Sequence, residues 1–142
     1  MTYPMSAYHF IVEIDSLNTI AFTEVSGLSA SVDVVESRDG SSPDSFPVKI
    51  PGLARVSNIV LKRGITKGNN DFYSWFNSSR EKTDRRNVAI KLLDEDKNVV
   101  MMWLLTNAFP SKIQYTGLQA LSSEVALEEL ELAYESLHVE TA

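Results

Sequence analysis

Apolar and polar residues alternate most regularly between Leu28 and Glu36. The residues of apolar parity are Leu28, Ala30, Val32 and Val34. Because successive side chains of a β-strand point to opposite faces, this pattern predicts a strand. We expect its apolar face to pack on a core. Its other face, formed by Ser29, Ser31 and Asp33, should be exposed to solvent.

Two shorter β-type runs precede this strand. Tyr8 to Ile14 alternates, a turn follows at Asp15 to Asn18, and Thr19 to Val25 is again rich in residues that favour strands. Two such runs joined by a short polar turn are typical of a hairpin. We therefore expect these runs to pair with each other.

A long polar segment, Arg38 to Pro51, comes next and reads as a loop. It ends at a strongly β-type run, Ala54 to Gly64, which predicts another strand. Phe46 is the one aromatic residue of the loop, and it either folds back onto its own domain or meets a partner. A compact domain has little reason to keep such a loop unless something binds it, so we expect a partner there.

One helix is predicted in the middle of the chain. Phe72, Trp75 and Phe76 follow helical spacing just after the polar residues Asn69 to Asp71, which suit a helix start. The aromatic face should cover part of a sheet. We expect it to be core and not an aromatic platform for a ligand.

A second hairpin is predicted after the helix. Asn87 to Leu93 and Val99 to Phe109 read as strands on either side of a polar turn. Pro110 cannot donate a ladder hydrogen bond and should end the second strand, with Ser111 to Tyr115 as a short continuation.

The last segment, Glu124 to Leu137, is ambiguous. One stripe of leucines and a tyrosine fits a helix, and Glu, Leu and Ala are good helix formers. The same residues fit a strand whose phase slips, if a bulge lies near Glu128 and Glu129. Local propensity alone favours the helix.

Composition places the chain among ordinary globular proteins with a single domain, residues 1–142. Hydrophobic residues make up 44% and charged residues 23% of its 142 positions. It has no cysteine, which excludes disulfides, thiolate zinc sites and cysteine nucleophiles. Residues 1–6 have no basic start and no apolar run, so we expect no secretory signal. No apolar run is long enough to span a membrane, and we expect no insertion by the monomer.

The net charge of −6 makes sequence-independent nucleic-acid binding unexpected. Charge is also uneven, since no Lys or Arg follows Lys112, whereas Lys62, Arg63 and the segment Arg80 to Arg86 are basic. This distribution fits solvated surface, or head-to-tail self-association between complementary patches.

Catalytic and metal-binding patterns do not emerge. The two histidines, His9 and His138, lie near opposite ends of the chain. Asp94 to Asn98 resembles the start of a calcium loop but lacks the required Gly and the final Glu. We therefore expect no cofactor, no metal and no enzyme activity. A structural protein and a monomeric β-barrel that binds a small ligand remain as alternatives.

A series of short motifs, in order along the whole chain, resembles the inner-tube proteins of contractile phage tails and of extracellular contractile injection systems. The segments that carry this resemblance are Phe22–Leu28, Glu36–Gly40, Lys49–Leu53, Asn58–Gly64, Phe72–Trp75 and Asn107–Pro110. One departure is Ser37, which stands where the family usually has an aromatic residue.

The resemblance implies a mainly β fold, an antiparallel β-barrel or two-sheet sandwich with one short α-helix, assembling into hexameric rings. It implies that the last segment is a strand and not a helix. It also implies a tube of stacked rings inside a contractile sheath, which is driven out to pierce a target envelope and pass protein cargo. The implied partners are other copies, sheath and baseplate proteins. Assembly would occur in the cytoplasm of the producing bacterium, within a phage tail or an injection particle that is released.

The extended loop after the third strand is implied to reach a neighbouring subunit or ring. Together with the basic pair, this gives the candidate contact residues Arg38, Asp39, Phe46, Lys49, Pro51, Lys62 and Arg63. A continuous channel is implied as well, and the small polar strand face gives its candidate lining residues, Ser29, Ser31 and Asp33.

Overall fold

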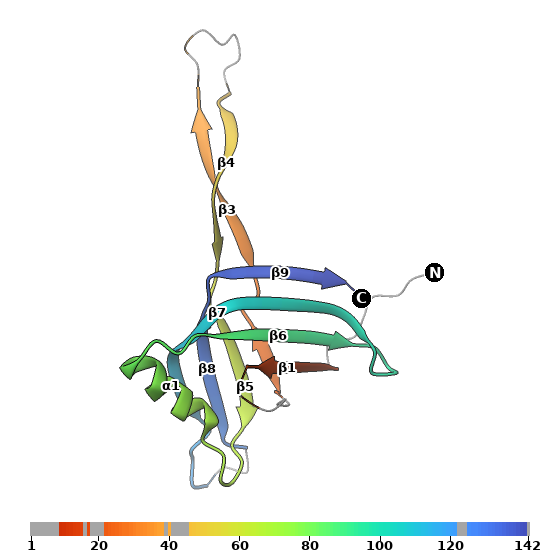
Figure 1. Ribbon diagram of the computed structural model, residues 1–142, viewed down its shortest axis with the longest axis vertical. Coiled ribbons are helices and arrows are strands. Elements are labelled where there is room, and N and C mark those ends of the chain that lie inside the picture. The colour runs from red at the N-terminus through yellow and green to blue at the C-terminus, as the bar shows by residue number, and fades with distance from the viewer. Residues whose placement is uncertain are drawn as a thin grey trace.

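The computed structural model describes residues 9–15, 17, 22–38, 40, 46–121 and 125–141. In these residues the chain forms antiparallel strands and one helix, as the sequence predicts (Figure 1). The elements are β1 (Phe10–Ile14), β2 (Glu24–Ser26), β3 (Ala30–Ser37), β4 (Val48–Val56), β5 (Ile59–Gly64), α1 (Asp71–Glu81), β6 (Arg86–Leu93), β7 (Val99–Thr116), β8 (Leu127–Ala133) and β9 (Ser136–Thr141).

Strand β7 organises the body of the molecule because it belongs to two parts of one bent sheet. Its first part, Met101–Thr106, pairs with β9 on one side, and β6 pairs along the other. Its second part, Phe109–Thr116, pairs with β8, which continues to β5 and β2. Figure 1 shows the strands of the two parts running in different directions on either side of the bend.

The prediction that Pro110 ends this strand is wrong. The strand passes through Pro110 and continues to Thr116, so the short continuation is part of it. A register shift lies between Pro110 and Lys112, and Asn107 just before it has a φ of 52°. A proline is tolerated at such an irregularity because a ladder hydrogen bond is interrupted there.

The predicted hairpin between the first two runs is also wrong. Strand β1 pairs with β6, whereas β2 pairs with β5 at the opposite end of the sheet order. Alternation identifies a strand but carries no information about its partner. Tyr8 and residues 18–21, which belong to the same prediction, lie outside the described residues.

Helix α1 packs its aromatic face inward, as predicted. Phe72 and Trp75 are at most 1% exposed, and the ring of Phe72 stacks on Phe22 at 5.5 Å. The Trp75 indole donates a hydrogen bond of 2.9 Å to the carbonyl oxygen of Asp84 in the connection to β6. This hydrogen bond ties the connection to the helix. None of the helices among the described residues has the length and hydrophobicity needed to cross a bilayer.

Asp84 gives the first testable prediction. Its carboxylate accepts hydrogen bonds from Arg86 and Ser78, and the Arg86 bond holds the pKa of Asp84 below its usual 3.8. A depressed folded-state pKa stabilises the fold above the unfolded pKa, and this stabilisation disappears as pH falls through the folded value. We expect Asp84→Asn to lower the free energy of unfolding by about 1–2 kcal/mol at pH 7. In acid denaturation compared by circular dichroism, the difference between the two proteins should shrink as pH falls below the usual carboxyl pKa of 3.8 and through the lower folded-state pKa of Asp84; a difference that does not change with pH in the acid range would contradict this.

The C-terminal segment is extended, as the family resemblance implies, and not the helix that local propensity favours. It forms two strands, β8 and β9, and not the single strand that was implied. In β8 every second residue is buried, namely Glu128, Leu130 and Leu132. The strand lies between β7 and β5, where ladder hydrogen bonds on both sides outweigh helix propensity. The alternation runs unbroken through Glu128 and Glu129, so the bulge expected there does not exist. The chain instead leaves the ladder at Tyr134 and Glu135, before β9.

Strands β3 and β4 pair only with each other among the described strands and form a two-stranded sheet. We call this hairpin, together with its tip, the arm. Figure 1 shows it projecting from one end of the body. The apolar face of β3 therefore does not pack on a core as predicted, since Val32 is 49% and Val34 is 62% exposed. The predicted loop is also shorter, because residues 48–51 belong to β4.

Pro51 sits inside β4, opposite Val34, next to a register shift between Val32 and Val34. The arm tolerates it because both strands of a two-stranded sheet are edge strands and the ladder is interrupted nearby. Gly52 is needed here as well, since a Cβ at this position would lie 3.0 Å from the Asp33 carbonyl oxygen. The proline and glycine thus shape a strand and not a loop.

Candidate assembly surfaces

The arm is the first candidate surface, because it exposes apolar side chains on both of its faces. Val34 lies opposite Pro51 on one face, and Val35 lies opposite Ile50 on the other. These side chains are about half exposed, and Phe46 near the tip is 83% exposed. Phe46 therefore does not fold back onto the described part of the domain. An isolated two-stranded sheet with wet apolar faces is marginal in water, so this surface suits a partner.

Four of the predicted contact residues lie together on this arm: Arg38, Phe46, Lys49 and Pro51, all of them exposed. Asp39 lies outside the described residues. The candidate lining residues Ser31 and Asp33 are on the arm as well, and Ser29 is at its base. The Arg55 Nε–H donates a bifurcated hydrogen bond to both carboxylate oxygens of Asp33, each at 2.9 Å, which links β3 to β4 at the solvent-exposed surface.

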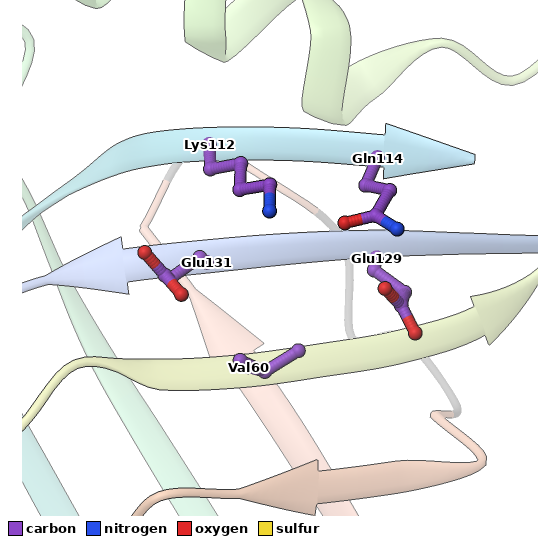
Figure 2. Close-up of a pocket in the computed structure, with 5 residues that line it drawn as sticks. All are labelled: Val60, Lys112, Gln114, Glu129 and Glu131. Atoms are coloured by element: carbon purple, nitrogen blue, oxygen red, sulfur yellow. The ribbon is translucent and has the colours of Figure 1, made fainter. Parts of the chain in front are cut away.

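The second candidate surface is the outward side of β2, β5, β8 and the second part of β7, which we call the polar face. Figure 2 shows Lys112 and Gln114 beside Glu129 and Glu131, with Val60 on the next strand. Lysines and glutamates face each other across the strands, since Lys112 is in register with Glu131 and Lys62 with Glu129. The face therefore carries both signs of charge, closely interspersed.

Lys62 is the centre of this charge pattern. Its Nζ lies 3.1 Å from a Glu24 oxygen and 3.2 Å from a Glu129 oxygen. The hydrogen bonds to Glu24 and then to Glu129 raise the pKa of Lys62 above its usual 10.5, so it stays charged. This lysine, expected at a subunit contact, is thus paired within its own chain. The signal in the sequence was the alternation of Glu129 and Glu131 with buried leucines, which is visible only once this segment is read as a strand.

Arg63, also expected at a subunit contact, lies in the interior. Its Nε donates a 2.8 Å hydrogen bond to Glu128, and the two side chains are 6% and 5% exposed. Its guanidinium lies 3.6 Å from the centre of the Phe72 ring. Strand alternation explains this position, because Ile59, Leu61 and Arg63 share the core side of β5. The surface donor we expected is therefore a buried ion pair that joins β5 and β8 beneath α1.

This buried pair is electrostatically unusual. Two further nitrogens of Arg63, Nη1 and Nη2, are buried and have no hydrogen-bond partner among the described residues. The phenol of Tyr115 is close by, and partial desolvation of this half-exposed side chain, followed by the charge of Glu128, raises its pKa above 10.0. The pair is a structural feature of the core, where a charge without its partner would be costly. In the part of the chain that the structure describes, no group of three His, Asp or Glu side chains is arranged to hold a metal.

A bent antiparallel sheet, one covering helix and a projecting two-stranded arm define a tail tube protein. The sequence matches the family described as T4-like virus tail tube protein gp19 over residues 6–138, and the chain belongs to this family. It is therefore a structural tube subunit, and the alternative of a monomeric ligand-binding barrel is not supported. No curated protein matches the chain.

Solved structures agree with this assignment. The chain is 30% identical to a protein in the anti-feeding prophage cap structure, with 100% of this chain and 94% of that chain covered and a TM-score of 0.91. It is also 30% identical to a protein in the sheath-tube complex of the PVC extracellular contractile injection system in its extended state, with 99% and 93% covered and a TM-score of 0.89. Hcp1 from Salmonella typhimurium shares the fold alone, at 12% identity and a TM-score of 0.65, with 96% and 87% covered.

Proposed function

We propose that six copies of this chain form a ring, and that rings stack into the inner tube of a contractile injection particle. Family membership supports the tube, and a similar protein, 26% identical, belongs to a baseplate structure with six-fold symmetry. A similar protein in a sheath-tube complex supports a sheath around the tube and a baseplate at its end. The particle would be assembled in the producing bacterium's cytoplasm and released.

The observation that supports a ring is that the sheet bearing the polar face has two free edges. Among the described residues, β2 pairs only with β5, and the second part of β7 pairs only with β8. Each edge presents unpaired backbone groups, and closing a sheet into a ring removes such edges. Joining β2 of one copy to β7 of the next closes the sheet, with the polar face turned to the channel.

The chemistry of the polar face suits a channel lining. Its two lysines, Lys62 and Lys112, stand among three glutamates, Glu24, Glu129 and Glu131, so the face is polar and carries a net charge of −1 per copy. Such a face offers nucleic acid no basic surface and an apolar polypeptide no apolar one. Protein cargo could therefore pass without being held. Ser29, Ser31 and Asp33 remain predicted lining residues, at the channel side of the arm. The tube needs no catalytic site, because sheath contraction supplies the work and the tube acts through its shape.

Electron microscopy of the purified protein tests this proposal. We expect rings with a central hole and six-fold averages, and tubes at higher protein concentration. Particles that stay monomeric at high concentration would overturn the proposal. A ring with another symmetry would overturn only the number of copies.

A further inference from the structure

The hydrophobic core of the subunit is open on one side. A cavity of about 180 Å³, which we call the side cavity, lies there between β1, β6 and β7 of one part of the sheet and β2 of the other. It is lined by Phe10, Val25, Leu28, Ile90, Leu92 and Trp103. Water has few hydrogen-bond partners in a cavity with such an apolar lining, so covering it with an apolar partner is favourable.

Two strands that each have a free edge in the described part of the chain contribute to this lining. Phe10 is on β1, which pairs with β6, and Val25 is on β2, which pairs with β5. Val25 and Leu28 pack against the core, so the side cavity lies on the core side of β2. A strand that pairs with the free edge of β2 therefore extends the sheet across the side cavity.

Core-facing side chains are left partly exposed at the opposite edge as well. One row of residues in register crosses these strands on their core side, namely Val25, Leu61, Leu130 and Ile113. The two inner residues of the row are fully buried, whereas Val25 and Ile113 at its ends are partly buried. Tyr115, two residues further along the free edge of β7, is 43% exposed.

The two edges are compatible in direction and in facing. Strands β7, β8, β5 and β2 are antiparallel in succession, so β7 and β2 run in opposite directions. The β7 strand of one copy beside β2 of the next therefore continues the antiparallel order and turns Ile113 to the core side. Strand tilt in a closed sheet shifts the register, and a shift of two residues places Tyr115 opposite Val25 with the same side inward.

We propose that the β7 edge of one copy closes the side cavity of the next copy in the ring, with Ile113 and Tyr115 as the covering side chains. The inference rests on the proposed ring and assigns the contact that completes each core. Trp103 is partly exposed in the single subunit and becomes covered in the ring. The cores of neighbouring copies then form one continuous apolar layer behind the channel lining.

Trp103 reports on the side cavity directly. The chain has two tryptophans, and Trp75 is already 1% exposed, so a change in tryptophan fluorescence on assembly comes from Trp103. We would compare unassembled subunits with rings by acrylamide quenching. Ring formation should remove most of the quenching and shift the emission maximum to shorter wavelength. The matched control, Trp103→Phe, keeps an aromatic side chain in the cavity and should form rings without either change.

Cysteine pairs identify the strand that covers the cavity, because the chain has no cysteine of its own. Val25→Cys is combined with Ile113→Cys in one variant and with Tyr115→Cys in another. Within one copy β5 and β8 separate these positions by roughly 14 Å, three strand spacings, which no disulfide spans. Oxidised rings of one of the two variants should give a ladder of linked copies on a denaturing gel. The matched control pairs Val25→Cys with Gln114→Cys, on the polar face of β7, and should give monomers.

Each result decides between clear alternatives. Rings in which acrylamide still quenches Trp103 would overturn the inference and leave the proposed ring intact. Rings in which Trp103 is covered but neither cysteine pair gives a ladder would also overturn it, because another segment would then close the cavity. Failure of the wild-type chain to form rings would remove the proposed function and this inference with it.

Discussion

Replacing Arg63 with alanine is expected to lower the free energy of unfolding by roughly 3–5 kcal/mol, because Glu128 would be left as a buried charge without a partner. For a chain of this length, such a loss lowers the melting temperature by on the order of 10 °C. The measurement is urea or thermal unfolding of unassembled subunits at one fixed concentration, since assembly also stabilises the folded state.

Two further variants separate the buried charge from the loss of contacts. Arg55→Ala removes an ion pair of similar length, 2.9 Å, whose side chains are 64% and 43% exposed, and should cost less than about 1 kcal/mol. The double variant Arg63→Met, Glu128→Leu replaces the buried pair with apolar groups and should recover most of the lost stability. If Arg63→Ala lowers the free energy of unfolding by less than about 1 kcal/mol, the unpaired charge of Glu128 is not costly. If the double variant recovers no stability, the loss in Arg63→Ala does not come from that unpaired charge.

Placing one carboxylate on each face of the arm, with Val34→Asp and Ile50→Asp, is expected to prevent tube assembly and leave the subunit folded. The two side chains are 62% and 45% exposed in the subunit, so the core does not depend on them. In an assembly that covers the arm, each substitution loses apolar burial and buries an unpaired charge, a combined cost above about 3 kcal/mol. The protein concentration needed for assembly should therefore rise by roughly 100-fold or more.

Sedimentation and electron microscopy across a concentration series measure this effect, with circular dichroism and the melting temperature as checks of folding. The matched control, Val34→Ile with Ile50→Val, keeps the apolar surface and should assemble like the wild type. Tubes from the aspartate variant at wild-type concentrations would show that the arm is not an assembly contact. An unfolded aspartate variant would contradict the independence of the core from the arm.

The candidate surfaces show how far local sequence patterns reach. Phe46 and Lys49 could be predicted to lie outside the core because the stretch around them lacks the pattern of a core element, and both are exposed in the structure. Arg63 could not be placed in the same way, because a charged residue in a β-type run reads as surface. Only the alternation around it, taken with Glu128 on the paired strand, reveals a buried pair.

By itself, the sequence determined that this protein is mainly β, that Phe72 and Trp75 lie on the inner face of one helix, and, through its ordered motifs, that it is a tube protein. The first two features depend on residues close together in the chain, where alternation and helical spacing act directly, whereas the third rests on the resemblance of motifs along the whole chain to a known family. The tertiary structure alone decided which strands pair, that Val32 and Val34 stay wet on an arm, that β7 continues through Pro110, and that Arg63 is buried. Each of these depends on partners distant in the chain, because burial and strand pairing are properties of the neighbours that folding brings together.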